Sequence, residues 1–467
     1  MLGALKTARG LPWAAPETRR EGARWQRNAT LFESLRVNQR ACAAGQDHAA
    51  SEKVKEMNRR MFCLSAAAAT LAANRAKTFA ALAAQVPAHG PLITLSEIET
   101  IDRERILRAA NEYLTAPPIT ITASSSPRSK GGKHDYFSEA DYWWPDPKNP
   151  GGPYIERDGY SDPQNFNDHR LALIRLSLIV PALTAAWLLT QDKRYAERAA
   201  AHLRAWFLAP ETRMNPSLDY AQAVWGHSSG RSYGIIDTLH LVEVTRAARH
   251  LEAAQAMTTA EFAGVREWFT EYLLWMRVSA NGQEEEAAKN NHGTCWTVQL
   301  AAFAAYVGNE NAILFCRERF RNHLLPDQMA EDGSFPLELK RSKPYNYSLF
   351  NLDMLAMVCV IASASGMAAN GATNNLWQFA LPSGNLYKKA VDFLFPYIED
   401  KSKWPYPHDV EYFDDLPNRQ PSLLFAGLAY REPTYIALWR TLPADPKTPE
   451  IIRNFPIRQP VLWLRPA

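Results

Sequence analysis

The sequence predicts an all-α protein in which paired helices stack around an axis. This arrangement is an (α/α) toroid, or incomplete α/α barrel, with long loops over one mouth. Between residues 95 and 398, segments that are apolar on nearly every side alternate with amphipathic segments that carry charges on one face. Strand signals are scarce in this region. Polar clusters precede the apolar segments, which would gather them at one mouth of the ring. An α-solenoid is the alternative, and the position of these clusters favours the toroid.

The composition is that of an ordinary globular protein, with 467 residues of which 46% are hydrophobic and 22% are charged. The formal net charge of +3 gives no indication of nucleic-acid binding. The five cysteines lack the spacing of a metal site. We therefore expect no metal ion, no other cofactor and no nucleic-acid partner. We also expect a monomer or a weak oligomer.

The N-terminal part does not resemble a folded domain. Residues 1–56 are rich in Ala and Arg and poorly patterned, so we expect a non-native or disordered extension. Residues 57–80 combine the basic pair Arg59 and Arg60 with a short apolar stretch and small residues, which resembles a twin-arginine export signal. A short amphipathic helix is the alternative. The apolar stretch is too short for a permanent anchor. We expect export to the periplasm or the cell exterior, and no other association with the membrane.

The folded part is expected to be one domain over residues 90–467. Its first helix begins near Leu95, where residues 96–99 resemble a helix cap, and it ends before Pro117 and Pro118. The next four residues, 119–122, are predicted to form a short strand or an extended segment.

A long polar and aromatic loop follows at residues 124–167, which we call the flap. A loop of this length inside a compact domain is usually functional or disordered. Its aromatic content, including Tyr142, Trp143 and Trp144, argues against disorder. We therefore predict an ordered flap that covers part of the molecule. The helices predicted after it are 168–190, 193–207, 232–251, 259–280, 296–307, 311–324, 348–366 and 386–398.

Four polar clusters lie where loops meet helices. They contain Arg, His, Asn, Tyr and Trp, but no pair of carboxylates at an obvious spacing. That absence weighs against a glycoside hydrolase, which needs two carboxyl groups flanking the scissile bond. It also weighs against a metal site. The clusters are Tyr142–Trp144, Trp225–Gly234, Asn290–His292 and Arg341–Tyr347.

Side chains of these types suit the removal of a proton next to a carboxylate, as at C5 of a uronic acid. Donors and a cation on that carboxylate stabilise the negative charge that develops in the transition state. Asn291, His292 and Arg341 fit this role, and Tyr347 fits the proton transfer. A nearby guanidinium favours the ionised form of a tyrosine, so we expect the pKa of Tyr347 to be lowered.

Several motifs in the same order resemble the alginate-lyase superfamily of polysaccharide lyases, over roughly residues 95–430. The resemblance implies an (α/α) toroid and a metal-free β-elimination under a flap. It places the Asn–His pair of the family on Asn291 and His292, its charge-neutralising arginine on Arg341 and its catalytic tyrosine on Tyr347. The motifs are His134-Asp135-Tyr136-Phe137-Ser138, Tyr142-Trp143-Trp144-Pro145-Asp146-Pro147, Asn290-Asn291-His292, and the segment from Asp332 to Leu352.

The six-residue gap between Arg341 and Tyr347 resembles the branch that cleaves mannuronan or glucuronan. The predicted substrate is therefore a β-1,4-linked polyuronate, with mannuronate-rich alginate preferred and glucuronan as the alternative. In these sugars the C5 proton and the C4 oxygen lie on one face, so Tyr347 could serve as base and acid, with His292 as carboxylate partner or second base. In guluronate they lie on opposite faces, and His292 would be the base. The residues expected to bind substrate are Tyr142, Trp143, Trp144, His227, Arg231, Tyr233, Lys340 and Tyr345.

Two other functions remain open at this point. A glycoside hydrolase on a similar toroid would need a carboxylate pair, for which Asp141, Asp146 and Glu338 are the loose candidates. A polyuronate-binding protein without activity would be expected to have lost part of the set Asn291, His292, Arg341 and Tyr347, and this set is intact. Trp143 and Trp144 could cap the core of the ring instead of stacking on a sugar.

Overall fold

The computed structural model describes residues 92–367, 371 and 373–466. The expected N-terminal extension, 1–56, and the expected export signal, 57–80, lie outside the described residues. Within them, helices dominate, and the strands are no longer than four residues.

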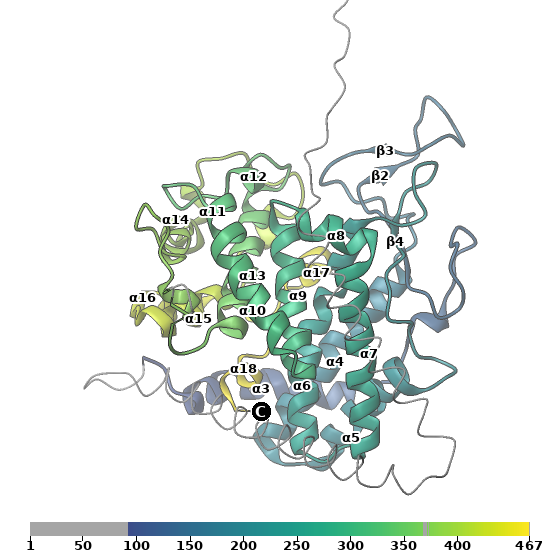
Figure 1. Ribbon diagram of the computed structural model, residues 1–467, viewed down its shortest axis with the longest axis horizontal. Helices are drawn as coiled ribbons and strands as arrows, with labels where there is room; N and C mark the ends of the chain where they lie inside the picture. The colour runs from purple at the N-terminus through teal and green to yellow at the C-terminus, as the bar shows by residue number, and fades with distance from the viewer. Residues whose placement is uncertain (1–91, 368–370, 372, 467) are drawn as a thin grey trace, which may run out of the picture. The chain divides into compact units, whose positions relative to one another are not determined.

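Five helices form the inner layer, and each packs against the next in chain order. Most of their side chains are buried. Four of the helices are apolar on nearly every side, whereas the second, Leu241–Ala253, is amphipathic. Figure 1 shows α9 and α13 side by side near the middle of this layer. The inner helices are α4 (Asp168–Thr190), α6 (Leu241–Ala253), α9 (Asn291–Val307), α13 (Pro344–Ala362) and α15 (Pro421–Tyr430).

An outer layer of more polar helices packs against the inner ones. The α3 helix begins with a capping box in which the side chains of Thr94 and Glu97 each accept the backbone N–H of the other residue. Alternating inner and outer helices confirm the predicted all-α toroid. The outer helices are α3 (Leu95–Tyr113), α5 (Lys193–Leu203), α7 (Thr259–Val278), α10 (Glu310–Arg319), α14 (Lys388–Glu399) and α16 (Pro433–Thr441).

The two ends of the described chain meet and close the ring. The last helix, α18 (Pro460–Leu464), packs against α3, α4 and α6. Asp102 of α3 is buried and pairs with Arg419 at 2.9 Å, and Arg105 pairs with Asp445 at 3.0 Å. These ion pairs join the first helix to the C-terminal segment.

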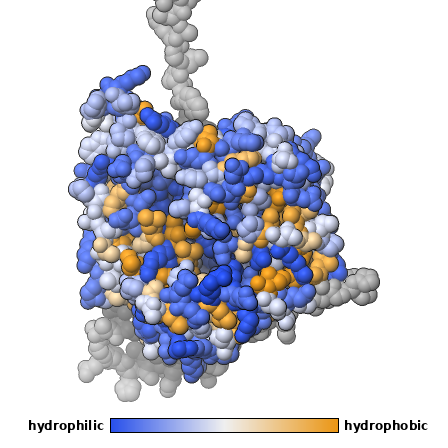
Figure 2. Space-filling view, turned by 180° about the vertical axis from the view of Figure 1, so that it is seen from behind, coloured by the Kyte–Doolittle hydropathy of each residue, from blue (hydrophilic) through white to orange (hydrophobic). Residues whose placement is uncertain are grey.

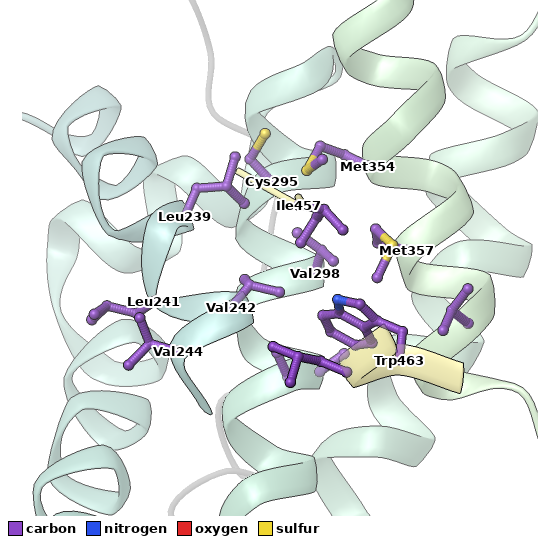
Figure 3. Close-up of a cluster of buried hydrophobic side chains, with 14 of the residues drawn as sticks. Leu239, Leu241, Val242, Val244, Cys295, Val298, Met354, Met357, Ile457 and Trp463 are labelled. Atoms are coloured by element: carbon purple, nitrogen blue, oxygen red, sulfur yellow. The ribbon is translucent and has the colours of Figure 1, made fainter. Parts of the chain in front are cut away.

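The centre of the ring is filled with apolar side chains. Figure 3 shows Val242, Val298 and Met357 of three inner helices around Trp463, which α18 inserts between them. The buried carboxylate of Glu243 holds this segment, accepting the indole N–H of Trp463 at 3.0 Å and two backbone N–H groups. The toroid is therefore a packed core rather than an open channel.

Two described helices, α4 and α13, are long and apolar enough to cross a membrane by length and composition alone. Their apolar windows are 78% and 94% buried inside the protein, so packing in the core accounts for their composition. Figure 2 shows the face behind the view of Figure 1, where hydrophilic side chains predominate between smaller apolar groups.

The flap is ordered, as predicted, and contains three short strands. Strand β1 (Phe137–Glu139) pairs in parallel with β4 (Tyr220–Ala223), which follows the outer helix α5. Strand β2 (Trp143–Trp144) pairs with β3 (Ile155–Glu156) in antiparallel orientation. Figure 1 shows the β2–β3 ribbon at the same end of the molecule as α8 and α12.

Several local predictions were wrong. Residues 119–122, predicted as a strand or an extended segment, form no strand. Thr120 is extended, and its side chain caps a 3₁₀ turn at Ile121–Ala123. The first part of the helix predicted at 232–251 is a 3₁₀ helix, Ser232–His240. Helices α9 and α13 begin several residues before the predicted starts, because Asn290 caps α9 and Pro344 occupies the first turn of α13.

Short helices complete the chain and were not predicted from the sequence. They surround the start of α9, the start of α13 and the C-terminal segment. They are α8 (Ala280–Ala287), α11 (Leu325–Gln328), α12 (Pro336–Leu339) and α17 (Pro449–Arg453). The predicted helices 193–207 and 311–324 end in π-helical turns, Arg204–Leu208 and Phe320–Leu324.

One buried carboxylate couples stability to pH. Asp353 of α13 accepts the backbone N–H of Ser422 at 3.1 Å, and burial raises the pKa of Asp353 to about 7. Because this folded-state pKa lies above the unfolded value of about 4, the folded protein binds the proton more tightly. Its contribution to stability is present at low pH and is lost as the pH rises through 7.

We expect Asp353→Asn to remove this pH-dependent loss of stability. The free energy of unfolding of the variant, relative to wild type, should increase between pH 4 and pH 7 by up to about 1.4 kcal/mol per pH unit. Urea unfolding at several pH values measures the difference. A difference that stays constant with pH would contradict the expectation, and Asp414→Asn, at a fully exposed side chain, serves as the control.

Candidate active site

The Asn291 side chain is fixed at the first turn of α9 by a buried carboxylate. Asn290 caps the helix by accepting the backbone N–H of His292 at 3.3 Å. The backbone N–H and the side-chain Nδ2 of Asn291 both donate to Glu338, each at 2.7 Å. Glu338 is 1% exposed, and burial raises its pKa although Asn291 opposes the rise. This pair ties the α12 segment to the start of α9.

His292 is held by a second buried carboxylate. Its Nδ1 lies 2.5 Å from Oε1 of Glu285, which belongs to α8 and is 2% exposed. A carboxylate accepts the Nδ1 proton, so the lone pair of the neutral imidazole is placed on Nε2. The ring of Tyr233 packs edge-to-face on the imidazole at 4.7 Å. The imidazole is therefore held in one orientation and one tautomer.

Arg341 follows α12 and forms a two-point ion pair with the flap. Its Nη2 and Nε lie 2.7 and 3.2 Å from the two carboxylate oxygens of Asp158. The guanidinium also lies 4.5 Å from the ring centroid of Tyr347. The flap thus meets the Arg341–Tyr347 cluster through a planar, bidentate contact.

Tyr347 lies at the end of the first turn of α13 and is 8% exposed. Its hydroxyl is 2.8 Å from the hydroxyl of Tyr142, the residue before β2. The expected lowering of the Tyr347 pKa is wrong for this structure. Burial raises the pKa, and the opposing effects of Arg341 and of the hydrogen bond from Tyr142 are smaller. Arg341 already shares its charge with Asp158, and burial disfavours the phenolate.

The other flap and turn residues form a connected aromatic row. The ring of Trp143 lies 5.0 Å from that of His227. The guanidinium of Arg231 lies 5.8 Å from the Trp143 ring and 4.7 Å from the Tyr233 ring. Tyr233 is 45% exposed and in turn contacts His292. The row runs from the flap to the imidazole and leaves aromatic surface open to solvent.

The remaining predicted binding residues do not join this row. Trp144 donates its indole N–H to the carbonyl of Tyr160 at 2.8 Å, so it is tied to the flap itself. Lys340 is exposed at the end of α12. Tyr345 was wrongly expected to bind substrate. It is 0% exposed, its ring packs on Trp404, and its hydroxyl donates to the carbonyl of Tyr397 at 2.9 Å.

A buried charge cluster beneath the flap was not anticipated. Lys343 is 0% exposed and pairs with Glu411 at 3.1 Å and with Glu450. Its ammonium lies 5.4 Å from the ring centroid of Tyr142. Two carboxylates therefore neutralise one buried ammonium next to the tyrosine pair.

Sequence reasoning missed the acidic partners of the site. Glu285 stands in a visible run of glutamates and Glu338 was considered only as a possible hydrolytic carboxylate. No motif near Asp158 or Glu450 in the sequence indicates a role in the site, because both residues reach it from segments far away in the chain.

The three carboxylates proposed for a hydrolase are committed to other partners. Asp141 pairs with both Arg170 and Arg453, and these arginines lower its pKa against the effect of burial. Asp146 accepts the backbone N–H of Lys148 in a turn at 2.9 Å. Among residues 92–466, apart from the short gaps, no group of three or more His, Cys, Asp or Glu is arranged to hold a metal ion.

The chain was compared with family models, curated proteins and solved structures. The family model described as alginate lyase matches residues 120–404. An alginate lyase from Bacteroides ovatus, known from a crystal structure, is 31% identical, with 79% of this chain and 94% of that chain covered and a TM-score of 0.67.

A second solved structure is more distant. Alginate lyase A1-III from Sphingomonas species A1 is 15% identical, with 72% of this chain and 86% of that chain covered and a TM-score of 0.43. A search of the curated proteins found no significant match.

The contact between Glu285 and His292 predicts the tautomer of the imidazole. At a pH where the ring is neutral, His292 should carry its proton on Nδ1, and Glu285→Ala should give a mixture of tautomers. Nitrogen-15 chemical shifts of labelled histidine distinguish the two forms. Glu284→Ala, at an exposed neighbouring position, is the matched control and should leave the spectrum unchanged. Identical spectra for Glu285→Ala and wild type would argue against the contact.

Proposed function

The chain belongs to the alginate lyase family and is a polysaccharide lyase, and from this premise we propose its substrate and mechanism. The substrate is a β-1,4-linked polyuronate, with mannuronate-rich alginate preferred and glucuronan as the alternative. Cleavage is a metal-free β-elimination that leaves a 4,5-unsaturated uronate. The observation that carries the proposal is the guanidinium of Arg341 over the ring of Tyr347 at the start of α13. Glu338, in the helix before Arg341, ties this segment to Asn291.

The first requirement of the reaction is to stabilise charge on the uronate carboxylate as the C5 proton leaves. Arg341 would bind this carboxylate in the two-point geometry that it now uses for Asp158, which presents the same chemical group. The Asn291 amide donates one hydrogen to Glu338 and has a second for the substrate. The Asn291 amide is held by the buried carboxylate of Glu338, so it needs little reorganisation as negative charge develops.

The second requirement is proton transfer. In mannuronate and glucuronate, the Tyr347 phenolate would take the C5 proton as the C4–C5 double bond forms and the C4–O4 bond breaks. The same hydroxyl would then give this proton to O4, which returns Tyr347 to the phenolate. The Tyr142 hydroxyl, 2.8 Å away, can donate a hydrogen bond to that phenolate and so favour it against the effect of burial.

His292 offers a second route for the proton. Glu285 places the imidazole lone pair on Nε2, as required of a base. In guluronate, where the C5 proton is on the opposite face, His292 would take it and Tyr347 would protonate O4. Whether the enzyme cleaves mannuronate or guluronate therefore indicates whether Tyr347 or His292 serves as the base.

The aromatic row supports binding of an acidic polysaccharide. Aromatic faces at Trp143 and Tyr233 suit the apolar faces of sugar rings, and Arg231 between them suits a uronate carboxylate. Lys340 and His227 are exposed beside these elements and complete the expected binding set. Export of the protein, expected from residues 57–80, stays a prediction.

Three polymers separate the possible functions. We expect an increase in ultraviolet absorbance from the unsaturated uronate with polymannuronate or polyglucuronate, and a slower increase or none with polyguluronate. New reducing ends without absorbance would indicate hydrolysis. Binding without either product would indicate a binding protein, and preference for polyguluronate would assign the base to His292.

The role of Tyr347 is tested by removing its hydroxyl. Tyr347→Phe should lower kcat by about a hundred- to ten-thousand-fold, because general acid–base catalysis contributes about that much. Tyr387→Phe is the control, since its hydroxyl donates to the carbonyl of Leu352 in the core at 2.7 Å and should affect stability only. Full activity of Tyr347→Phe in the absorbance assay would falsify the mechanism.

A further inference from the structure

We propose that Glu450 is a positioning residue for the lyase reaction, holding Tyr142 and the flap against Tyr347. The proposal rests on the proposed function and adds a residue to it. Glu450 lies on α17 (Pro449–Arg453), beyond residues 120–404 that match the family model. It is 8% exposed, and its two oxygens face different parts of the site.

The contacts of Glu450 connect three segments. Oε2 accepts the hydroxyl of Ser161, in the flap, at 3.0 Å. Oε1 lies 3.4 Å from the hydroxyl of Tyr142 and pairs with the ammonium of Lys343. Arg453, one turn further along α17, lies 3.8 Å away. A single carboxylate thus joins two parts of the flap to Lys343, the residue before α13.

These contacts place Tyr142 from two sides. The Lys343 ammonium lies under its ring, and Glu450 faces its hydroxyl. The same hydroxyl is 2.8 Å from Tyr347, which is the shorter and stronger contact. The single proton of the Tyr142 hydroxyl can be donated to Glu450 or to the Tyr347 oxygen, and Glu450 and Lys343 together limit where the ring can move. Small displacements of reacting groups cost about a hundred-fold in rate, so such support matters for catalysis.

Glu411 provides a matched comparison within the same cluster. It also pairs with Lys343, at 3.1 Å, but it comes from a different loop, and its contact is with the lysine rather than with Tyr142 or Ser161. If Glu450 served only to neutralise Lys343, loss of either carboxylate would have the same effect. If Glu450 positions Tyr142, loss of Glu450 alone should impair the reaction.

The charges that face Tyr347 predict that loss of Glu450 also changes the pKa of Tyr347. Arg341 and Arg453 favour its phenolate, Asp158 and Glu450 disfavour it, and Tyr142 donates a hydrogen bond to it. Removal of the Glu450 charge should therefore lower the pKa of Tyr347. A limb of the pH profile that depends on ionised Tyr347 should move to lower pH in Glu450→Gln.

The experiment compares Glu450→Gln with Glu411→Gln on the polyuronate that the wild-type protein cleaves. We expect kcat of Glu450→Gln to fall about ten- to a hundred-fold with KM changed less than about three-fold, and Glu411→Gln to stay within about three-fold of wild type. In a Tyr142→Phe background, the loss caused by Glu450→Gln should be much smaller, because the two residues act together.

The possible outcomes are distinct. Equal losses in the two glutamine variants, or additive losses with Tyr142→Phe, would overturn the positioning role. If Glu450→Gln does not fold, Ser161→Ala, which removes only the flap contact, should give a smaller loss of kcat in the same direction, and an unchanged kcat would overturn the proposal. Wild-type protein that yields no unsaturated product from any polyuronate would instead reject the proposed function.

Discussion

The double hydrogen bond between Asn291 and Glu338 is the interaction on which the rest of the site depends. It ties the first turn of α9 to the segment that carries Arg341 and leads into α13. Both residues are almost fully buried, so loss of either partner would leave polar groups unpaired inside the protein. Because the two inner helices are packed against each other, this contact sets how Asn291 and His292 stand relative to Arg341 and Tyr347.

Buried carboxylates organise the site in a repeated way. Glu338 holds Asn291, Glu285 holds His292, and Glu450 contacts Tyr142. In each case the acid is less than a tenth exposed. Under the proposed function, the acids fix geometry and the neutral and basic groups bind the anionic polymer. An acid that faced the substrate directly would repel it.

The fold supplies the rigid frame for this arrangement. Trp463 fills the centre of the ring, and the ion pairs of Asp102 and Arg105 close it, so the inner helices have a packed core on one side and the site at their ends. The flap contributes Tyr142 and Asp158 and is bound to the helical frame through Glu450 and Arg341. The helices thus determine where the flap sits.

The helical toroid, the ordered flap and the positions of Asn291, His292 and Tyr347 near helix starts could be predicted from the sequence. These features follow from local pattern, since apolar periodicity and short motifs involve neighbouring residues. The acidic partners could not be predicted, because Asp158 and Glu450 come from distant segments that only folding brings to the site. The tertiary structure also decided the raised pKa of Tyr347, which depends on what buries it. Tyr345 and Tyr347 differ by about 200° around a helix that is buried on nearly every side, and a pattern without a polar face cannot tell which of them faces the site.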